Sequence, residues 1–477
     1  MGSIASQSIK GAFWSAVERF SLQGIQFVIG IILARLLSPS DFGLIGMLAI
    51  FLSISQIFID CGFSNALIRL KNVSKEDYGT AFLVTFLISC ACFVILFFLA
   101  PFVSDFYQIP ELKSVMRVVS LSIIINALFT VHKVRLTREI DFKTQSKVSL
   151  FSALVSGVLG ICLAFSGFGV WSLVWQNIVN ALLNLLSFSF ILRWFPKPCF
   201  NKASFKGMFS FGSKLLVSSL IHSVYSNMYN IVIGKFFTAA NLGFYTRADH
   251  LASFPSSNVA SILSRVTYPI LSKLQDDVEK LLDVYKKYLL LSCFVVFPLM
   301  MGLCALANPV IHILLGEKWS GTVLLMQILC FGLMLDPICN INLNVLYVKG
   351  RSDLVLRLEI IKKTIAVAIL IASISYGLVG MCVGRAVYGV ISTFLNMVYT
   401  KNFIDLTIFQ QVKLVLPSYL LSIVMACCVY GSILLFDAYW LQLLAGTIVG
   451  IIVYLLPAVV FKMDAWVVCL QYLKGQK

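Results

Sequence analysis

Residues 32–46 read ILARLLSPSDFGLIG, and residues 232–246 read VIGKFFTAANLGFYT. In each stretch an apolar run ends at a basic residue, a short polar turn follows, and a glycine comes soon after, Gly43 in one copy and Gly243 in the other. The constant order of these features predicts that the chain contains an internal duplication. Duplicated halves are a common construction of membrane transporters, so the repeat bears directly on the fold.

Long apolar segments flank each copy of the repeat and continue along the chain. Hydrophobic residues make up 59% of the sequence and charged residues 12%, whereas soluble domains carry about 25% charged residues. A run of about 20 apolar residues can cross a bilayer as a helix. The sequence therefore predicts an all-α, polytopic membrane protein of about 14 transmembrane helices. The expected ranges are 12–36, 42–68, 79–103, 114–133, 147–166, 169–194, 207–235, 241–270, 284–306, 322–347, 354–375, 378–400, 411–436 and 439–461.

Basic residues gather on every second connection between these segments. Clusters of Lys and Arg lie at 69–75, 133–147, 193–206, 265–287 and 349–363, while the alternate connections hold few. Because Lys and Arg collect on cytoplasmic connections, both termini are predicted to be cytoplasmic and the protein to be of the multi-pass inner-membrane type. The same topology accounts for the net charge of +16, so we expect no nucleic-acid partner.

A second pair of matching segments supports the duplication, since SGFGVWSLVWQ starts at Ser166 and SYGLVGMCVGR starts at Ser375. The copies lie six predicted helices apart, so both cross the membrane in the same direction. The sequence thus predicts two pseudo-symmetric six-helix lobes in parallel repeat, followed by an extra helix pair. The expected boundaries are 1–200 for the N-terminal lobe, 201–405 for the C-terminal lobe and 406–477 for the pair.

Polar side chains line one face of the first two predicted helices. In the helix 12–36, Arg19, Gln23 and Gln26 recur at helical spacing, and Glu18 precedes Arg19. The helix 42–68 carries a similar polar face made of Ser53, Gln56, Asp60 and Ser64.

The seventh and eighth predicted helices, which are the duplicated counterparts, also carry polar residues. Lys214, His222 and Asn230 follow one face of the seventh helix, together with several serines, and Arg247 and Asp249 lie in the eighth. The third, fifth, thirteenth and fourteenth predicted helices are almost wholly apolar. The polar residues are therefore concentrated in two helix pairs that the repeat relates to each other.

These intramembrane polar groups have two interpretations. A charged side chain that faces lipid costs about 3 kcal/mol, so such residues usually face protein or water. A water-filled cavity between two lobes explains all four polar faces. Further candidates to line it are Gln176, Asp336, Asn340, Asn342, Asn344 and Arg385. Alternatively, Ser, Asn and Gln hydrogen-bond between helices, and each acid only balances a nearby Arg or Lys.

The chain offers no metal or cofactor motif. Its 13 cysteines contain no CxxC spacing, and its 4 histidines are scattered. Small buried apolar positions suit most of these cysteines, which lie within apolar segments. We therefore expect no cofactor, no metal site and no catalytic residues.

Several segments resemble a known family. ARLLSPSDFGLIGM, GFSNALIR, LGFYTRADH and LLGEKWSGTVLLMQIL are similar to segments of bacterial lipid-linked oligosaccharide flippases. The chain most resembles the colanic-acid and lipopolysaccharide exporter branch of the multidrug, oligosaccharidyl-lipid and polysaccharide exporter superfamily. The resemblance covers nearly the whole chain. It implies two lobes that alternate access to a cationic central cavity, and a polyprenyl-diphosphate-linked glycan as the substrate.

The resemblance also implies roles for the polar residues. Arg19 and Arg247, supported by Lys214, would bind the diphosphate, because a guanidinium binds phosphate oxygens in a bidentate manner. The remaining candidates for substrate binding are Gln23, Gln26, Asn230 and Arg385. The lipid tail would stay in the bilayer. Such a protein would move undecaprenyl-diphosphate-linked repeat units to the outer leaflet for surface polysaccharide assembly.

Alternatives remain at this stage. A cation-coupled drug or small-solute antiporter has the same fold, whereas a membrane glycosyltransferase or polymerase would need larger outer loops than this chain has. The three acids Glu18, Asp60 and Asp249 are candidates to bind a coupling ion, because nothing in the sequence resembles a nucleotide-binding loop. Besides the lipid bilayer and the lipid-linked glycan, a polysaccharide polymerase and other assembly proteins are candidate partners.

Overall fold

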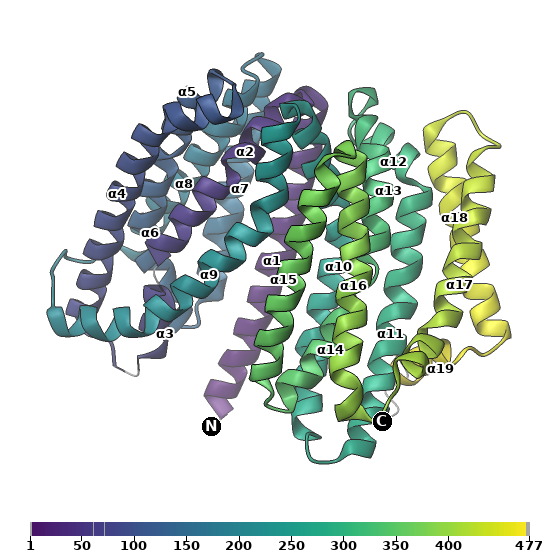
Figure 1. Cartoon of the computed structure of the whole chain (residues 1–477). Coiled ribbons are helices and arrows are strands. Elements are labelled where there is room, and N and C mark those ends of the chain that lie inside the picture. Colours follow the sequence, from purple (N-terminus) through teal and green to yellow (C-terminus); the bar gives the residue numbers. More distant parts are fainter. Residues whose placement is uncertain (1, 61, 71, 474–477) are drawn as a thin grey trace. The chain divides into compact units, whose positions relative to one another are not determined.

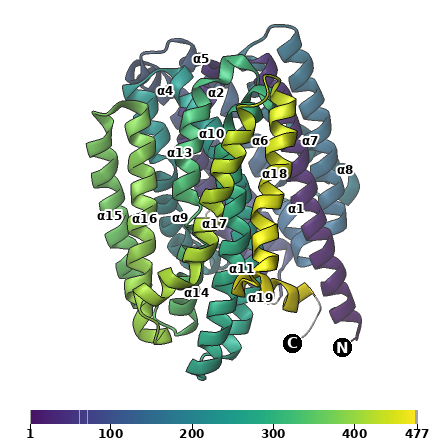
Figure 2. The same ribbon diagram turned by 90° about the vertical axis from the view of Figure 1, so that its right-hand side faces the viewer.

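The computed structural model describes the backbone of residues 2–60, 62–70 and 72–473. The side chains of 2–13, 15–16, 214, 262–266 and 472–473 are outside the description. The described residues form helices joined by turns and short irregular segments and contain no strand, so the predicted all-α class is confirmed. It divides into two units, Met1–Gly243 and Phe244–Lys477 (Figures 1 and 2).

The first unit holds nine helices and the start of a tenth. They are α1 (Gly2–Leu36), α2 (Pro39–Asp60), α3 (Phe63–Arg69), α4 (Lys75–Tyr107), α5 (Glu111–Val119), α6 (Leu121–Arg138), α7 (Phe142–Phe165), α8 (Val170–Leu192), α9 (Lys202–Phe236) and α10 (Ala239–Lys273). Helix α10 continues into the second unit. Figure 1 shows the first turns of α9 lying across the direction of α4 and α6 before the helix turns along it.

The second unit contains the rest of α10 and nine further α-helices. These are α11 (Val278–Ala305), α12 (Ala307–Leu314), α13 (Gly321–Leu333), α14 (Asp336–Val348), α15 (Ser352–Ile374), α16 (Gly377–Ile404), α17 (Ile408–Ile433), α18 (Tyr439–Val460) and α19 (Asp464–Leu473), with a short 3₁₀ turn at Glu317–Trp319. In Figures 1 and 2, α15 lies beside α16, and α17 lies beside α18.

The helices follow the predicted apolar segments. Among the described residues, 11 segments are long and apolar enough to cross a membrane. The chain is therefore a multi-pass membrane protein, while the predicted count of about 14 spans is not confirmed. Helices α9, α10 and α15, which occupy three further predicted spans, are absent from those 11 segments. The three-part division at residues 200 and 405 stays a prediction. The first unit described here ends at Gly243 and includes α9.

Local capping explains where several helices begin. Ser74 caps α4, since its hydroxyl accepts from the backbone N–H of Asp77 and the Asp77 carboxylate accepts in return from the N–H of Ser74. Thr407 and Gln410 form the same reciprocal pair at the start of α17. Such pairs satisfy N–H groups that the first helical turn leaves without partners.

One predicted helix is broken in the structure. The expected range 42–68 is divided into α2, which ends at Asp60, and α3, which starts at Phe63. Gly62 takes a positive φ of 67° at the break, a conformation that glycine adopts at little cost. The prediction of one continuous helix was therefore wrong, and Asp60 lies at a helix end rather than in a helix interior.

The two copies of the duplicated motif contact each other within residues 1–243. A Cβ atom at Gly43 would lie 1.8 Å from the carbonyl oxygen of Ala239, and one at Gly243 would lie 1.9 Å from that of Pro39. Pro39 and Ala239 hold equivalent positions in the two copies, as do Gly43 and Gly243. The contact is thus reciprocal, and it explains why both copies carry glycine at this position.

Candidate functional site

A polar cavity of about 690 Å³ lies between α2 and α9 in the first unit. Its lining residues are Ser53, Gln56, Ile57 and Asp60 from α2, and Ser218, Ser219, His222, Ser223, Ser226 and Asn227 from α9. We call this cavity the Asp60 pocket. Two of the polar faces predicted from the sequence therefore meet across an open space of the size that holds small ligands.

The polar groups of the Asp60 pocket do not bond across it. Ser226 donates its hydroxyl to the carbonyl oxygen of His222 at 2.9 Å, and the Asn227 amide donates to that of Ser223 at 3.0 Å. Asp60 accepts from the Ser64 hydroxyl in α3. Among the ten lining residues, no side chain of α2 hydrogen-bonds to a side chain of α9. Hydrogen bonding between helices therefore does not account for these two faces.

One lining hydroxyl has no partner at all. The Ser223 side chain is 6% exposed, and its oxygen makes no hydrogen bond in the described structure. A buried hydroxyl without a partner costs about 1–3 kcal/mol, so such groups are usually satisfied by water or ligand. The Asp60 pocket thus has spare hydrogen-bonding capacity.

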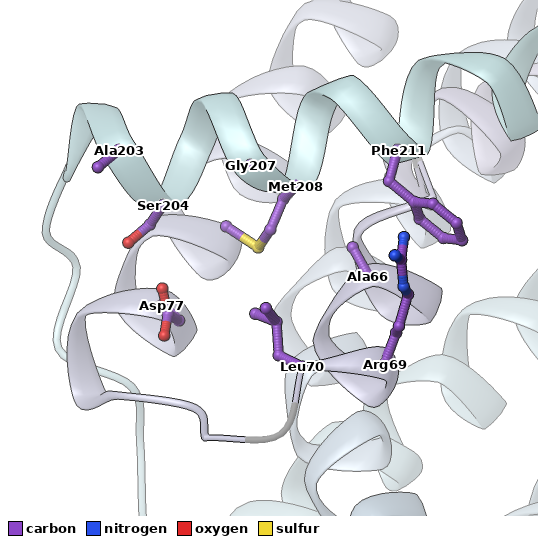
Figure 3. Close-up of a pocket in the computed structure, with 9 residues that line it drawn as sticks. All are labelled: Ala66, Arg69, Leu70, Asp77, Ala203, Ser204, Gly207, Met208 and Phe211. Atoms are coloured by element: carbon purple, nitrogen blue, oxygen red, sulfur yellow. The ribbon is translucent and has the colours of Figure 1, made fainter.

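A second cavity, of about 630 Å³, lies further along α9 toward its start. Helices α3, α4 and α9 line it with Ala66, Arg69, Leu70, Asp77, Ala203, Ser204, Gly207, Met208 and Phe211 (Figure 3). The Arg69 guanidinium carbon lies 4.8 Å from the centre of the Phe211 ring, an attractive cation–π geometry. The Asp77 carboxylate, in contrast, is already engaged by Ser74.

A close helix crossing separates the two cavities. A Cβ atom on Gly62 would lie 2.5 Å from the Cα atom of Gly212, so the two backbones touch. Residues of α9 before Gly212 line the cavity beside Arg69, and residues from Ser218 onward line the Asp60 pocket. The break after Asp60 therefore fixes where the polar pocket ends.

The candidates of the first helix have unlike environments. Arg19 and Gln26 are exposed on α1. Gln23 is half-buried, and its side-chain oxygen has no partner among the described residues. Glu18 is buried at 8% exposure, where its carboxylate accepts from the Ser149 hydroxyl of α7 at 3.2 Å. Arg19 therefore remains available to a ligand, whereas Glu18 contributes to the packing of α1 on α7.

In the second unit, two predicted candidates pair with each other. Arg385 of α16 places Nη2 2.7 Å from Oδ1 of Asp249 in α10, and its Nη1 donates to the Tyr245 hydroxyl. The sequence suggested a substrate contact for Arg385 and an ion site for Asp249. The ion pair matches the alternative in which an acid balances a nearby Arg. Nothing in the sequence indicated this contact, because the two residues lie more than a hundred positions apart.

Other polar residues of the second unit are engaged as well. Ser256 lies 3.2 Å from the Asp336 carboxylate and 2.9 Å from the Leu333 carbonyl oxygen. Arg247 is half-buried in α10 and has contacts within the described structure. Lys214 and Asn230 both lie in α9, where Asn230 is half-buried. The side chain of Lys214 is outside the described residues.

A buried network joins four helices of the second unit, and Asn342, a sequence candidate to line the cavity, is fully buried in it. The Tyr285 hydroxyl of α11 lies 3.2 Å from Oδ1 of Asn342 and 3.0 Å from Oε1 of Gln411. The Thr400 hydroxyl in α16 lies 3.3 Å from the Asn342 carbonyl oxygen. Single polar residues in apolar helices gave no signal that they would converge. The network ties α17 to α11, α14 and α16.

An apolar groove of about 600 Å³ lies between α11, α17 and α18. Its walls include Pro298 and Gly302 of α11, Met425 of α17, and Gly446 and Gly450 of α18. The small residues leave space that larger side chains would fill. In the described residues, no group of three or more His, Cys, Asp or Glu side chains could hold a metal ion.

Curated proteins with similar sequences work in polysaccharide biosynthesis. The chain is 26% identical over 401 residues to the lipopolysaccharide biosynthesis protein WzxC of Escherichia coli (strain K12), covering 83% of this chain and 81% of that protein. It is 27% identical over 356 residues to the teichuronic acid biosynthesis protein TuaB of Bacillus subtilis (strain 168), covering 74% of each.

Solved structures share the fold. The inward closed conformation of the lipid II flippase MurJ matches with a TM-score of 0.75 at 17% identity, over 95% of this chain and 99% of that one. An inward-facing multidrug resistance transporter of the MATE family matches with a TM-score of 0.62 at 17% identity, over 80% and 94%. At these identities the match concerns the fold alone. The fold is therefore that of MurJ-like and MATE-like transporters.

The family model described as polysaccharide biosynthesis protein matches residues 32–324, which include both copies of the duplicated motif and the whole of the Asp60 pocket. The match covers more than half of the chain, and the chain belongs to this polysaccharide biosynthesis protein family.

Proposed function

We propose that this protein flips polyprenyl-diphosphate-linked oligosaccharides from the inner to the outer leaflet of the bacterial cytoplasmic membrane, for surface polysaccharide assembly. The observation that carries the proposal is the family match over residues 32–324. The MurJ-like fold supplies a transporter architecture, and the Asp60 pocket supplies polar groups within apolar helices. The protein acts in this proposal as a transporter and not as an enzyme.

The diphosphate is assigned to Arg19 and Arg247. A guanidinium forms bidentate hydrogen bonds with phosphate oxygens, and its charge balances that of the head group. Arg19 is exposed on α1, which supports this role. Lys214 is proposed to assist as a further cation, and Gln23, Gln26 and Asn230 to bind polar parts of the substrate. Arg385 is a weaker candidate because Asp249 occupies its guanidinium.

The polyprenyl chain needs an apolar surface. The groove between α11, α17 and α18 offers such a surface, lined by Pro298, Gly302 and Met425. The lipid tail is proposed to stay in the bilayer.

A vesicle assay tests the function. Purified protein is reconstituted with an undecaprenyl-diphosphate-linked oligosaccharide, and a glycosidase added outside cleaves the glycans that it can reach. Vesicles with a flippase should lose nearly all of their glycan, whereas protein-free vesicles should retain the inner-leaflet share. Equal cleavage in both kinds of vesicle would exclude the proposed function.

Charge removal tests the diphosphate assignment. Arg19→Ala and Arg247→Ala should each slow flipping about 10- to 100-fold, because a charge-assisted hydrogen bond of about 1.5–3 kcal/mol is lost. Lys at either position should restore only part of the rate, because the planar fork is absent. Lys113→Ala, which removes an exposed cation of α5, is the matched control and should flip at the wild-type rate. Unchanged flipping in both Arg variants would refute the assignment.

Topology is proposed to place both termini in the cytoplasm. Ser74 and Ser320 are both exposed and lie on connections predicted to face opposite sides. In a cysteine-free background, a membrane-impermeant thiol reagent applied to intact cells should label Ser320→Cys and spare Ser74→Cys. The reverse labelling pattern would invert the proposed orientation.

Energy coupling through a carboxylate remains a proposal. Of the three acids predicted to bind a coupling ion, Asp249 is paired with Arg385 and Glu18 accepts from Ser149, whereas Asp60 faces a cavity. An imposed pH or sodium gradient should change the flipping rate of reconstituted protein if an ion is coupled. Transport that ignores both gradients and the membrane potential would remove the coupling role from all three.

A further inference from the structure

We propose that the Asp60 pocket is the subsite for the glycan, and that its carboxylate selects a neutral or amino sugar over an acidic sugar at the position it contacts. The inference rests on the proposed function, since it concerns the glycan of the lipid-linked substrate. It names the chemical class of the sugar, which the family match does not indicate. All of its residues belong to the first unit.

The lining of the pocket matches the chemistry of a sugar. A sugar presents many hydroxyl groups, each of which both donates and accepts hydrogen bonds. The pocket offers serine hydroxyls from both helices, the Gln56 and Asn227 amides, the His222 ring and the Asp60 carboxylate. Its volume of about 690 Å³ lies within the range of small-ligand sites, about 300–1,000 Å³.

The hydrogen bonds of the lining residues leave room for a ligand. Ser64 occupies one oxygen of Asp60, Oδ1, and no described residue bonds to Oδ2. The amide of Asn227 donates to its own helix and keeps its side-chain oxygen for another donor. The Ser223 hydroxyl, which is buried and without a partner, lines the same cavity. Groups that point into one space and lack partners there are what a polar ligand would satisfy.

The charge of the pocket gives the selectivity. Of the ten described lining residues, Asp60 alone carries a full charge when His222 is neutral. In a partly desolvated site, a second carboxylate close to Asp60 is repelled, whereas a hydroxyl or an ammonium group donates to it. Lys214 lies one helical turn before Ser218 in α9, and its side chain is outside the described residues. It is therefore included in the test.

Binding measurements with matched ligands test the selectivity. Two undecaprenyl-diphosphate trisaccharides are compared that differ only in carrying a hexose or the corresponding hexuronate. Wild-type protein in detergent should bind the neutral compound about tenfold more tightly, which corresponds to about 1.4 kcal/mol. Asp60→Asn should abolish this ratio, and Asp60→Lys should invert it.

Controls separate the pocket from general charge effects. Asp105→Asn removes an exposed acid of the same unit outside the pocket and should leave the ratio unchanged. The inference fails if wild type binds both compounds equally, or if Asp105→Asn acts as strongly as Asp60→Asn. It also fails if Lys214→Gln alone abolishes the ratio, or if Asp60→Asn removes only a response to ion gradients.

The vesicle assay distinguishes this inference from the proposed function. Selective binding that depends on Asp60, without any flipping, would refute the proposed function and retain the glycan subsite. Flipping of both compounds at equal rates, with equal binding, would retain the function and overturn the inference.

Ser223→Ala provides a readout that a structural hydroxyl would not give. Removing a buried hydroxyl without a partner should keep or raise the melting temperature of the ligand-free protein, because no hydrogen bond is lost. The same variant should bind the neutral trisaccharide several-fold more weakly. A lowered melting temperature with unchanged binding would assign Ser223 to structure and contradict the inference.

Discussion

Two polar regions of the molecule differ in how their side chains are bonded: the contacts of Arg385 and Tyr285 in the second unit, and the Asp60 pocket in the first. In the second unit, Arg385 is held by Asp249 and Tyr245, and Tyr285 lies within hydrogen-bond distance of two amide oxygens. In the first unit, the lining residues of the Asp60 pocket bond only to groups on their own side, and Ser223 has no partner. The first arrangement stabilises the helix bundle, whereas the second leaves polar groups that a ligand can bind.

The difference separates stability from ligand binding. A partly buried charge that already has its counter-charge contributes through that pair, and its loss is felt in folding. A polar group that faces a cavity contributes little to folding, so its retention in an apolar helix needs another reason. The comparison therefore predicts which substitutions will lower the unfolding free energy. Three measurements test it.

The largest effect is expected at the ion pair of the second unit. Arg385→Ala leaves Asp249 without its partner in a partly buried site, which should lower the unfolding free energy by about 3 kcal/mol. Asp60→Asn, the matched change in the first unit, should leave the unfolding free energy nearly unchanged. Thermal unfolding in detergent measures both variants. A loss in Asp60→Asn equal to that in Arg385→Ala would remove the distinction between the units.

The double variant Arg385→Ala with Asp249→Ala checks the cause. If the unpaired carboxylate is responsible, removing it as well should recover part of the lost stability. Additive losses would mean that the two side chains contribute independently.

A smaller effect is expected in the buried network. Tyr285→Phe removes the hydroxyl that contacts the Asn342 and Gln411 side chains, so the unfolding free energy should fall by about 1–3 kcal/mol. Tyr376→Phe, at a side chain that is 79% exposed, should have no effect. Ser223→Ala provides the comparison in the first unit. A cost for Ser223→Ala as large as that for Tyr285→Phe would show that both hydroxyls stabilise the fold.

The smallest effect is expected at an exposed pair outside the predicted spans. The Arg351 guanidinium makes two contacts of 2.9 and 2.8 Å with Asp353, and it lowers the pKa of that carboxyl to about 2. Because the folded pKa lies below the ordinary value, any stability from the pair is present above about pH 4 and lost as the pH falls toward 2. Wild type and Asp353→Asn should therefore differ slightly at pH 6 and converge near pH 2. A difference in stability between the two proteins that grows as the pH falls would contradict this prediction.

Periodicity was sufficient to predict the helices and the polar faces. Apolar length predicted the helical segments, and the spacing of Gln56 and Asp60 correctly placed them on one face of α2. The two copies of the predicted repeat contact each other reciprocally through Gly43 and Gly243. These features depend on neighbours a few residues apart or on a copied motif, and both are visible in a single sequence.

Long-range pairing was not predictable. The contact between Arg385 and Asp249, and the convergence of Tyr285, Asn342 and Gln411, depend on how distant helices pack. The break at Gly62 was also missed, because a single glycine in an apolar run does not distinguish a helix interior from a left-handed turn. The three acids predicted to share one role have different environments. Glu18 is buried against α7, Asp249 is paired with Arg385, and Asp60 faces a cavity.

The reciprocal packing of Gly43 on Ala239 and of Gly243 on Pro39 has a consequence for the ancestry of the chain. In an interface between two identical subunits related by a twofold axis, each side presents both partners of the contact. The first copy of the motif alone carries Pro39 and Gly43, so it is complementary to a second copy of itself. Such a reciprocal contact is what we expect when duplication and fusion join the two halves of a homodimer in one polypeptide. Each glycine admits the backbone of the other copy, so a larger side chain at either position would disrupt the same contact.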